Sequence, residues 1–277
     1  MSSPALASPF LVTKEHRRFA EFCDACRRYR YIGLCFGPPG VGKTLSARRY
    51  AHWDQVEHCG PNWMPSSTPP PGVEAGMGFD TILYTPQVSN SPGQIGREIE
   101  GLRQDVRMLS WYQIRQENVR QEGVSEEQRD QADPVTLVLV DEADRLKMAG
   151  LEQVRDLFDR EGVGLVLIGM PGLEKRLSRY AQFYSRVGFV HAFRPLSEDE
   201  MRHLLTEKWR QMGLALTEGD FTDEEASAAI LRITGGNLRL LHRLLAQIER
   251  ILTLNDLRTV TREVVEAARE GLVIGSV

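Results

Sequence analysis

The sequence predicts an α/β fold, with a parallel β-sheet flanked by helices and followed by a small all-helical domain. Short, uniformly apolar runs alternate with helical patterns over the first two thirds of the chain, as in parallel sheets covered on both faces. A glycine-rich segment separates the first of these runs from a helix, and after Pro195 only helical patterns remain. We therefore expect an N-terminal helical segment (residues 1–30), an α/β core (31–194) and a helical domain (195–277).

The composition is that of a soluble globular protein. The chain has 277 residues, of which 42% are hydrophobic and 26% are charged, enough for one large domain and a smaller one. The net charge of -4 neither requires nor excludes nucleic acid, so any such contact needs a local basic surface. The sequence has no signal-peptide pattern and no apolar run long enough to span a membrane. We expect a cytoplasmic protein without a membrane partner.

The first helix is expected between Lys14 and Arg30. Its apolar face carries Cys23 and Cys26, whose spacing also fits half of a zinc site. Because no second regular pair of metal ligands follows, we favour the interpretation that both cysteines are small core residues.

Five apolar runs predict the strands of the sheet. The run nearest the centre of the chain is almost entirely β-branched residues and leucine, which is typical of a strand buried on both faces. The predicted strands are Tyr31 to Phe36, Thr81 to Tyr84, Val135 to Val140, Gly164 to Ile168 and Phe189 to Phe193.

The connections between these strands differ in character. Residues 53–80 contain several prolines and glycines and are expected to form one long loop of unassigned role. A helix is expected from about Pro92 to Tyr112, before a polar stretch that ends at Asp133. In the helical domain, Ser197 with Glu200 and Thr222 with Glu225 fit the capping box that begins a helix.

The glycine-rich segment has the spacing of a phosphate-binding loop between a buried strand and a helix. Its glycines allow backbone N–H groups to surround phosphates at the positive end of the helix. Lys43 is expected to reach the β- and γ-phosphates of ATP, and Thr44 to offer its hydroxyl to Mg²⁺. The expected nucleotide-binding residues are Gly37, Pro38, Pro39, Gly40, Val41, Gly42, Lys43, Thr44 and Leu45, together with Asp141.

Two adjacent acidic residues follow the central predicted strand. Asp141 is expected to join Thr44 as a magnesium ligand, and Glu142 to polarise the water that attacks ATP. The run Asp141-Glu142-Ala143-Asp144 also occurs in RNA helicases, but those need a second sheet domain, whereas the remaining chain is helical and short. These acids favour hydrolysis over nucleotide binding alone.

With these two motifs and the helical domain after the sheet, the sequence resembles the AAA+ ATPases. The resemblance covers almost the whole chain and implies a ring or filament whose active site is completed by a neighbouring subunit. It assigns Arg186 as the arginine finger, with Arg179 as the alternative, and Arg239 in Gly236-Asn237-Leu238-Arg239 as sensor 2. At the sensor-1 position the chain departs from the family, because Met170 cannot orient a water. We therefore expect slow hydrolysis stimulated by DNA or a partner.

A finer resemblance is to the transposition regulators, the group of TnsC, TniB and the B protein of phage Mu. The runs Asp141 to Lys147 and Leu167 to Glu174 carry it, together with the compact size. It implies a bacterial, mobile-element protein that assembles on double-stranded DNA with ATP, marks a target site and recruits a transposase. ATP hydrolysis would then release the protein from the DNA. A target-selector protein would be a further partner.

The DNA contacts of such proteins would fall between the second strand and Asp141. The candidates are Arg97, Arg103, Arg107 and Arg115. Acidic residues lie among them, so an exposed helix laced with salt bridges is an equal interpretation. Two other functions stay open: an AAA+ ATPase acting on protein partners in secretion or signalling, and a nucleotide-gated scaffold that barely hydrolyses ATP.

Overall fold

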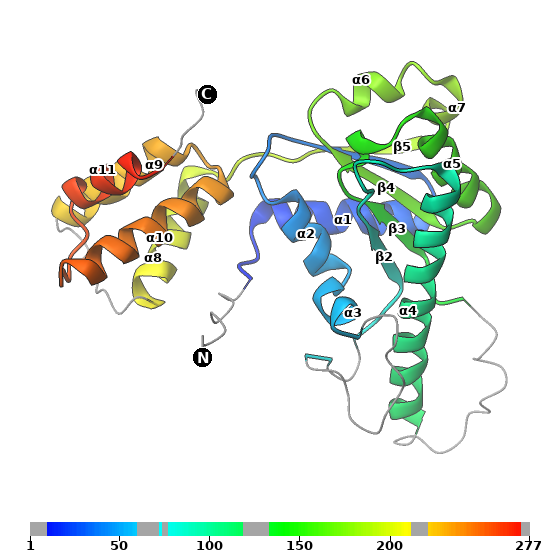
Figure 1. Ribbon diagram of the computed structural model, residues 1–277, viewed down its shortest axis with the longest axis horizontal. Coiled ribbons are helices and arrows are strands. Elements are labelled where there is room, and N and C mark those ends of the chain that lie inside the picture. Colours follow the sequence, from blue (N-terminus) through cyan, green and yellow to red (C-terminus); the bar gives the residue numbers. More distant parts are fainter. Residues whose placement is uncertain (1–9, 60–71, 74–76, 119–132, 212–220, 273–277) are drawn as a thin grey trace. The chain divides into compact units, whose positions relative to one another are not determined.

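The computed structural model describes residues 10–59, 72–73, 77–118, 133–211 and 221–272 (Figure 1). The chain forms two compact units. One contains residues 18–37 and 43–192, and holds the β-sheet. The other contains residues 1–17, 38–42 and 193–277, and is built around the C-terminal helices.

The sheet has five strands in the order β2-β3-β4-β1-β5, and every neighbouring pair is parallel. The predicted fold class is therefore confirmed, since helices flank this sheet and a helical region follows it (Figure 1). The strands are β1 (Ile32–Phe36), β2 (Thr81–Tyr84), β3 (Leu137–Val140), β4 (Gly164–Gly169) and β5 (Val187–Ala192).

The register of the parallel strands places their carboxyl ends at one edge. Phe36 at the end of β1 pairs with Gly169 at the end of β4, and Val140 at the end of β3 pairs with Leu167 of β4. Residues that follow β1, β3 and β4 in the sequence therefore lie close together, the usual place for a ligand site in open α/β sheets. The edge strand β5 alternates between exposed and partly covered residues, because successive side chains of a strand point to opposite faces of the sheet.

The helices of the sheet-containing unit pack by their apolar faces. Helix α1 (Lys14–Tyr29) lies so close to β1 that a Cβ atom added at Gly33 would meet Cys26 and Phe22. Cys23 and Cys26 are both fully buried in this packing, and burial raises the pKa of the Cys26 thiol to about 12. The other helices are α2 (Lys43–Tyr50), α3 (Trp53–Cys59), α4 (Pro92–Asn118), the short η2 (Ala143–Arg145), α5 (Met148–Glu161), α6 (Leu173–Leu177) and α7 (Ala181–Tyr184).

The expectation of one long loop over residues 53–80 was wrong at its start, where α3 forms. Trp53, Val56 and Cys59 recur at helical spacing and are buried, so this short segment has an apolar face of its own. Arg48 of α2 binds the side chains of Asp54 and Glu57 and fixes the exposed side of α3. Residues 60–71 and 74–76 of the expected loop lie outside the described residues.

The C-terminal helices are α8 (Glu198–Gln211), α9 (Phe221–Thr234), α10 (Leu238–Leu254) and α11 (Arg262–Glu270). Their core includes the buried side chains of Trp209, Leu241 and Val265. The predicted capping box begins α8, since Ser197 N–H donates to Glu200 and Glu200 N–H donates to Ser197 Oγ. The second predicted box was wrong, because α9 already includes Phe221 and Thr222. Within the described residues, no helix is both long and apolar enough to cross a membrane.

Candidate functional site

The glycine-rich loop adopts the backbone conformation that its sequence predicts. Gly40 and Gly42 have φ angles of 79° and 107°, in the left-handed region that only glycine occupies without strain. The loop follows β1, and α2 begins at Lys43, so the positive end of that helix follows the loop directly. Alternating left-handed residues before a helix suit a cradle for an anion such as phosphate.

Lys43 and Thr44 supply the side chains at the end of this loop. Lys43 Nζ donates to the carbonyl oxygen of Gly37 at 2.6 Å, and Thr44 Oγ1 donates to Asp141 Oδ2 at 2.6 Å. The structure therefore brings together the two predicted magnesium ligands, which lie 97 positions apart in the sequence. The set fits Mg²⁺, which is commonly held by one or two protein oxygens together with phosphate oxygens and water.

Asp141 is the most buried acid of the site, with 3% of its surface exposed. Burial raises the pKa of its carboxyl group, while the bonds from Thr44 and from the Glu142 N–H, and the charge of Lys43, oppose the rise. A divalent cation at the same oxygens would favour the charged carboxylate.

Glu142, the predicted activator of the attacking water, has a φ angle of 50°, which is strained for a residue with a side chain. Its carboxylate forms an ion pair with Arg145 of η2. Arg145 also donates to the carbonyl oxygen of Pro86 at 3.0 Å, in the segment between β2 and α4. The carboxylate next to Asp141, the predicted magnesium ligand, is thus already engaged by an arginine, a partner that the sequence pattern did not reveal.

The end of β4 is joined to the site by Asp144. Its Oδ2 accepts a hydrogen bond from the Met170 N–H at 2.7 Å, and a Cβ atom at Gly169 would lie 2.5 Å from the same oxygen. Gly37 N–H in turn donates to the carbonyl oxygen of Gly169 at 3.3 Å. Met170 does occupy the position after β4, but a carboxylate lies directly beside it. The sequence interpretation gave Asp144 no role, although its place in the acidic run was a signal.

In the second unit, residues 38–42 of the loop contact the start of α10. Asn237 caps this helix by accepting a bond from Leu240 N–H at 3.1 Å, and its Nδ2 donates to the carbonyl oxygen of Pro39 at 3.0 Å. The backbone N–H of Arg239 donates to the Gly40 carbonyl at 3.0 Å, while the Arg239 side chain is exposed. Asn237 therefore contacts the loop directly, a contact that the sequence interpretation did not assign.

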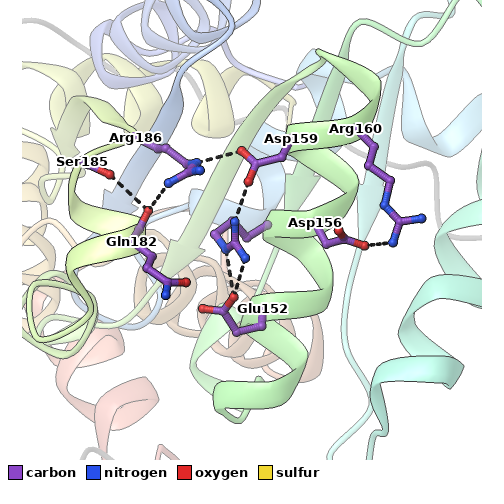
Figure 2. A network of polar contacts seen from close by, with 8 residues as sticks. Glu152, Asp156, Asp159, Arg160, Gln182, Ser185 and Arg186 are labelled. Carbon is purple, nitrogen blue, oxygen red and sulfur yellow. Dashed lines mark hydrogen bonds and ion pairs between the residues drawn. The ribbon is translucent and has the colours of Figure 1, made fainter.

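Arg186 lies at the opposite edge of the sheet from the phosphate-binding loop. Its carbonyl oxygen accepts from the N–H of Ile32, the first residue of β1, whereas the loop begins after the last residue of that strand. Five residues of strand span about 16 Å, which is farther than an arginine side chain reaches. Figure 2 shows the guanidinium of Arg186 bound to Asp159 of α5 and to Gln182 of α7. Arg179, the alternative finger, is exposed between α6 and α7.

The four candidate DNA-contacting arginines all fall on α4 but differ in environment. Arg97 and Arg107 are exposed. Arg103 is buried, with 10% of its side chain exposed, and pairs with Glu161 and Asp133, so it is not available to a phosphate backbone. The side chain of Arg115 lies outside the part of the chain that the structure describes.

Comparison with known families accounts for this loop and the two acids that follow β3. The AAA domain family matches residues 26–177, more than half of the chain, and this range includes Lys43, Thr44, Asp141 and Glu142. The chain belongs to the AAA domain family. The match ends before Arg186 and before the helical unit, so the roles of those regions rest on their geometry.

Two relatives and one solved structure are similar to this AAA domain protein. A potential ATP-binding protein of Staphylococcus aureus is 45% identical over 276 residues, covering 96% of this chain and 97% of that one. The Mu-like prophage FluMu DNA transposition protein B of Haemophilus influenzae is 33% identical over 114 residues, covering 38% of this chain and 36% of that one. The RuvB Holliday junction branch migration motor of Thermotoga maritima shares the fold with a TM-score of 0.58 at 15% identity, covering 96% and 71% of the two chains.

Proposed function

We propose that this AAA domain protein is an ATPase that assembles with copies of itself on double-stranded DNA in the presence of ATP. In this proposal the assembly marks a target site for a transposase, with or without a target-selector protein, and hydrolysis drives its disassembly. The observation that carries the proposal is the separation of Arg186 from the phosphate-binding loop of its own chain, because a second copy is then needed to complete the site.

Each step of ATP hydrolysis has a residue of suitable chemistry. The loop residues and Lys43 bind the phosphates, and Thr44 and Asp141 hold Mg²⁺, which when bound neutralises phosphate charge. Glu142 accepts a proton from the attacking water once its carboxylate is released from Arg145. Arg239 follows the N-cap of α10 and is proposed to contact the γ-phosphate from the same chain.

Arg186 of one copy is proposed to act on the nucleotide of the next. A guanidinium beside the transferring phosphoryl group stabilises charge that develops in the transition state, and fingers of this kind raise kcat by about 10³ to 10⁵. Because the group is supplied in trans, hydrolysis depends on assembly. The ATPase rate therefore reports how much of the protein has assembled.

The proposed DNA surface is the exposed face of α4. Arg97, Gln104 and Arg107 recur along it at helical spacing and are exposed. Contacts of this kind go to phosphates, so binding should tolerate changes of sequence and weaken steeply with salt. The partial similarity to a DNA transposition protein supports a role in transposition.

Electron microscopy of the protein with duplex DNA and a slowly hydrolysed ATP analogue tests the proposal. We expect rings or filaments at low salt, and their absence would contradict it. The variant Arg97→Glu/Arg107→Glu should lose DNA binding while ATP binding stays intact. Arg210→Glu, which reverses an exposed arginine on α8, is the matched control and should bind DNA normally.

A second candidate function is an AAA ATPase that acts on a protein partner without DNA, as in secretion or signalling assemblies. The acidic residues on α4 favour it, because Glu100 is exposed between Arg97 and Arg107 and weakens their combined field. Unchanged DNA binding after reversal of both arginines, or no binding to begin with, would favour this function.

A further inference from the structure

The guanidinium of Arg186 is held by bonds from two separate elements. Its Nε donates to Asp159 Oδ1 at 2.7 Å, and its Nη1 donates to the carbonyl oxygen of Gln182 at 2.7 Å (Figure 2). The hydroxyl of Ser185 donates to the same carbonyl oxygen at 3.3 Å. The end of α5 and helix α7 together fix a side chain that is still 35% exposed.

Asp159 is itself held in place by its own helix. Its second carboxylate oxygen accepts a bond from Arg155, four residues earlier on α5. Arg155 is bound in turn by Glu152, at 2.8 Å from its Nε. Charges therefore alternate along the row Glu152, Arg155, Asp159 and Arg186. With both oxygens engaged, the carboxylate of Asp159 is a fixed acceptor for Arg186.

This arrangement orients Arg186 without using up its donors. A guanidinium has five N–H groups, and the described contacts of Arg186 use Nε and Nη1. Nη2 and the second hydrogen of Nη1 remain for an acceptor outside the chain. A guanidinium that is already fixed in orientation loses less conformational entropy when it binds a phosphate, which is the advantage of a preorganised group.

The pair contributes little to the stability of the fold. Asp159 and Arg186 are each about one-third exposed, and ion pairs in such positions contribute only slightly to folding. Loss of the Asp159 carboxylate should therefore change the orientation of Arg186 far more than it changes the melting temperature.

We propose that Asp159 is a positioning residue that aims Arg186 at the nucleotide of a neighbouring copy. The inference rests on the proposed assembly and names a residue through which it works. If Asp159 instead held Arg186 away from the nucleotide, removal of Asp159 would release the arginine and speed hydrolysis. The unused terminal amino groups favour positioning.

Mixed assemblies separate this role from a structural one. A Glu142→Gln copy still binds ATP and supplies Arg186 but hydrolyses ATP very slowly, because it lacks the proposed general base. An Arg186→Ala copy keeps its own loop but supplies no finger. The two copies are mixed with duplex DNA and ATP. Hydrolysis then occurs only at contacts where the copy with native Arg186 supplies its finger to the nucleotide site of the Arg186→Ala copy. Asp159→Ala is then added to one kind of copy at a time.

In the Glu142→Gln copy, Asp159→Ala should lower kcat of the mixture at least about tenfold with an unchanged KM for ATP, because misplaced catalytic groups lose rate steeply. The same substitution in the Arg186→Ala copy should have no effect. Asp159→Asn retains an acceptor for Nε and should recover part of the loss. Asp156→Ala, which removes a neighbouring acid paired with Arg160, is the control and should leave the rate unchanged (Figure 2).

Equal losses in both kinds of copy, an unchanged rate, or a faster rate would overturn the positioning role. A drop in melting temperature matching the loss of rate would also overturn it. If the mixture with native Asp159 does not hydrolyse ATP although the native protein does, the proposed completion of the site by a neighbour fails instead, and the inference fails with it.

Discussion

Thr44 Oγ1 lies 2.6 Å from Asp141 Oδ2, so the first turn of α2 is joined to the end of β3 by a hydrogen bond. The two residues belong to different motifs, and the parallel register of the sheet brings them together. Their bond brings together a hydroxyl and a buried carboxylate, the two oxygen groups that we propose as ligands of Mg²⁺.

Asp141→Asn should separate nucleotide binding from its dependence on magnesium. The amide can still accept the Thr44 bond but is a poor ligand for Mg²⁺, so ATP affinity should no longer rise when magnesium is added. Calorimetric titration of ATP with and without the metal measures this, and Thr44→Val, which lacks the hydroxyl, is the matched comparison. A full magnesium response in Asp141→Asn would exclude the assigned ligand.

The same variant should be more stable than the native protein when no metal is added. Burial raises the pKa of Asp141, so the folded state holds its proton at a higher pH than the unfolded state does. Stability from this group is therefore lost as pH rises from the unfolded to the folded pKa, and at neutral pH the charged form is a cost. Thermal melts at pH 7 should show a higher Tm for Asp141→Asn, and the gain should shrink toward pH 4.

Arg145→Ala should raise the basal ATPase rate several-fold, because it releases the carboxylate of Glu142 from its ion pair. Arg145→Lys keeps a positive charge and should show a smaller increase. Steady-state rates without DNA measure the effect. Addition of Glu142→Gln should abolish the gain and lower the rate at least about 100-fold below the native value, as expected for loss of a general base. A rate lowered by Arg145→Ala alone would mean that the pair supports catalysis.

Gly40→Ala should weaken ATP binding at least about tenfold for two independent reasons. A left-handed φ costs an alanine about 1–2 kcal/mol, and the new Cβ atom would lie 2.4 Å from Asn237 Oδ1. Asn237→Ala removes the second cost, so the double variant should regain part of the affinity. Nucleotide titrations of all four proteins form a double-mutant cycle, and strict additivity would show that Asn237 does not contact the loop in solution.

Arg103→Ala should destabilise the fold by about 1–3 kcal/mol, because it removes a largely buried side chain and leaves the partly exposed carboxylates of Glu161 and Asp133 without their partner. The exposed Arg107→Ala should change stability by less than about 0.5 kcal/mol. Urea unfolding followed by circular dichroism compares the two. Equal stability of both variants would contradict the buried ion pair.

The sequence by itself determined the strand-loop-helix unit, the acidic pair after β3 and the parallel sheet. Each depends on local signals, such as glycines that permit left-handed turns and apolar runs too uniform for a surface strand. The boundaries of β2 were predicted to the residue, because Thr81 to Tyr84 is flanked by polar and proline-rich sequence.

Tertiary structure alone decided which charges are paired between different elements of the fold. Arg103 lies on the same helical stripe as the buried Ile95, Ile99 and Val106, so its spacing was a signal, yet only packing of α4 near the end of α5 supplies Glu161. Likewise Asp159 meets Arg186 only because α5 and the turn before β5 come together in space. A sequence pattern shows the period of a helix or strand. It does not show which charged side chain of another element will lie within bonding distance, because that depends on the packing of segments that are distant in the chain.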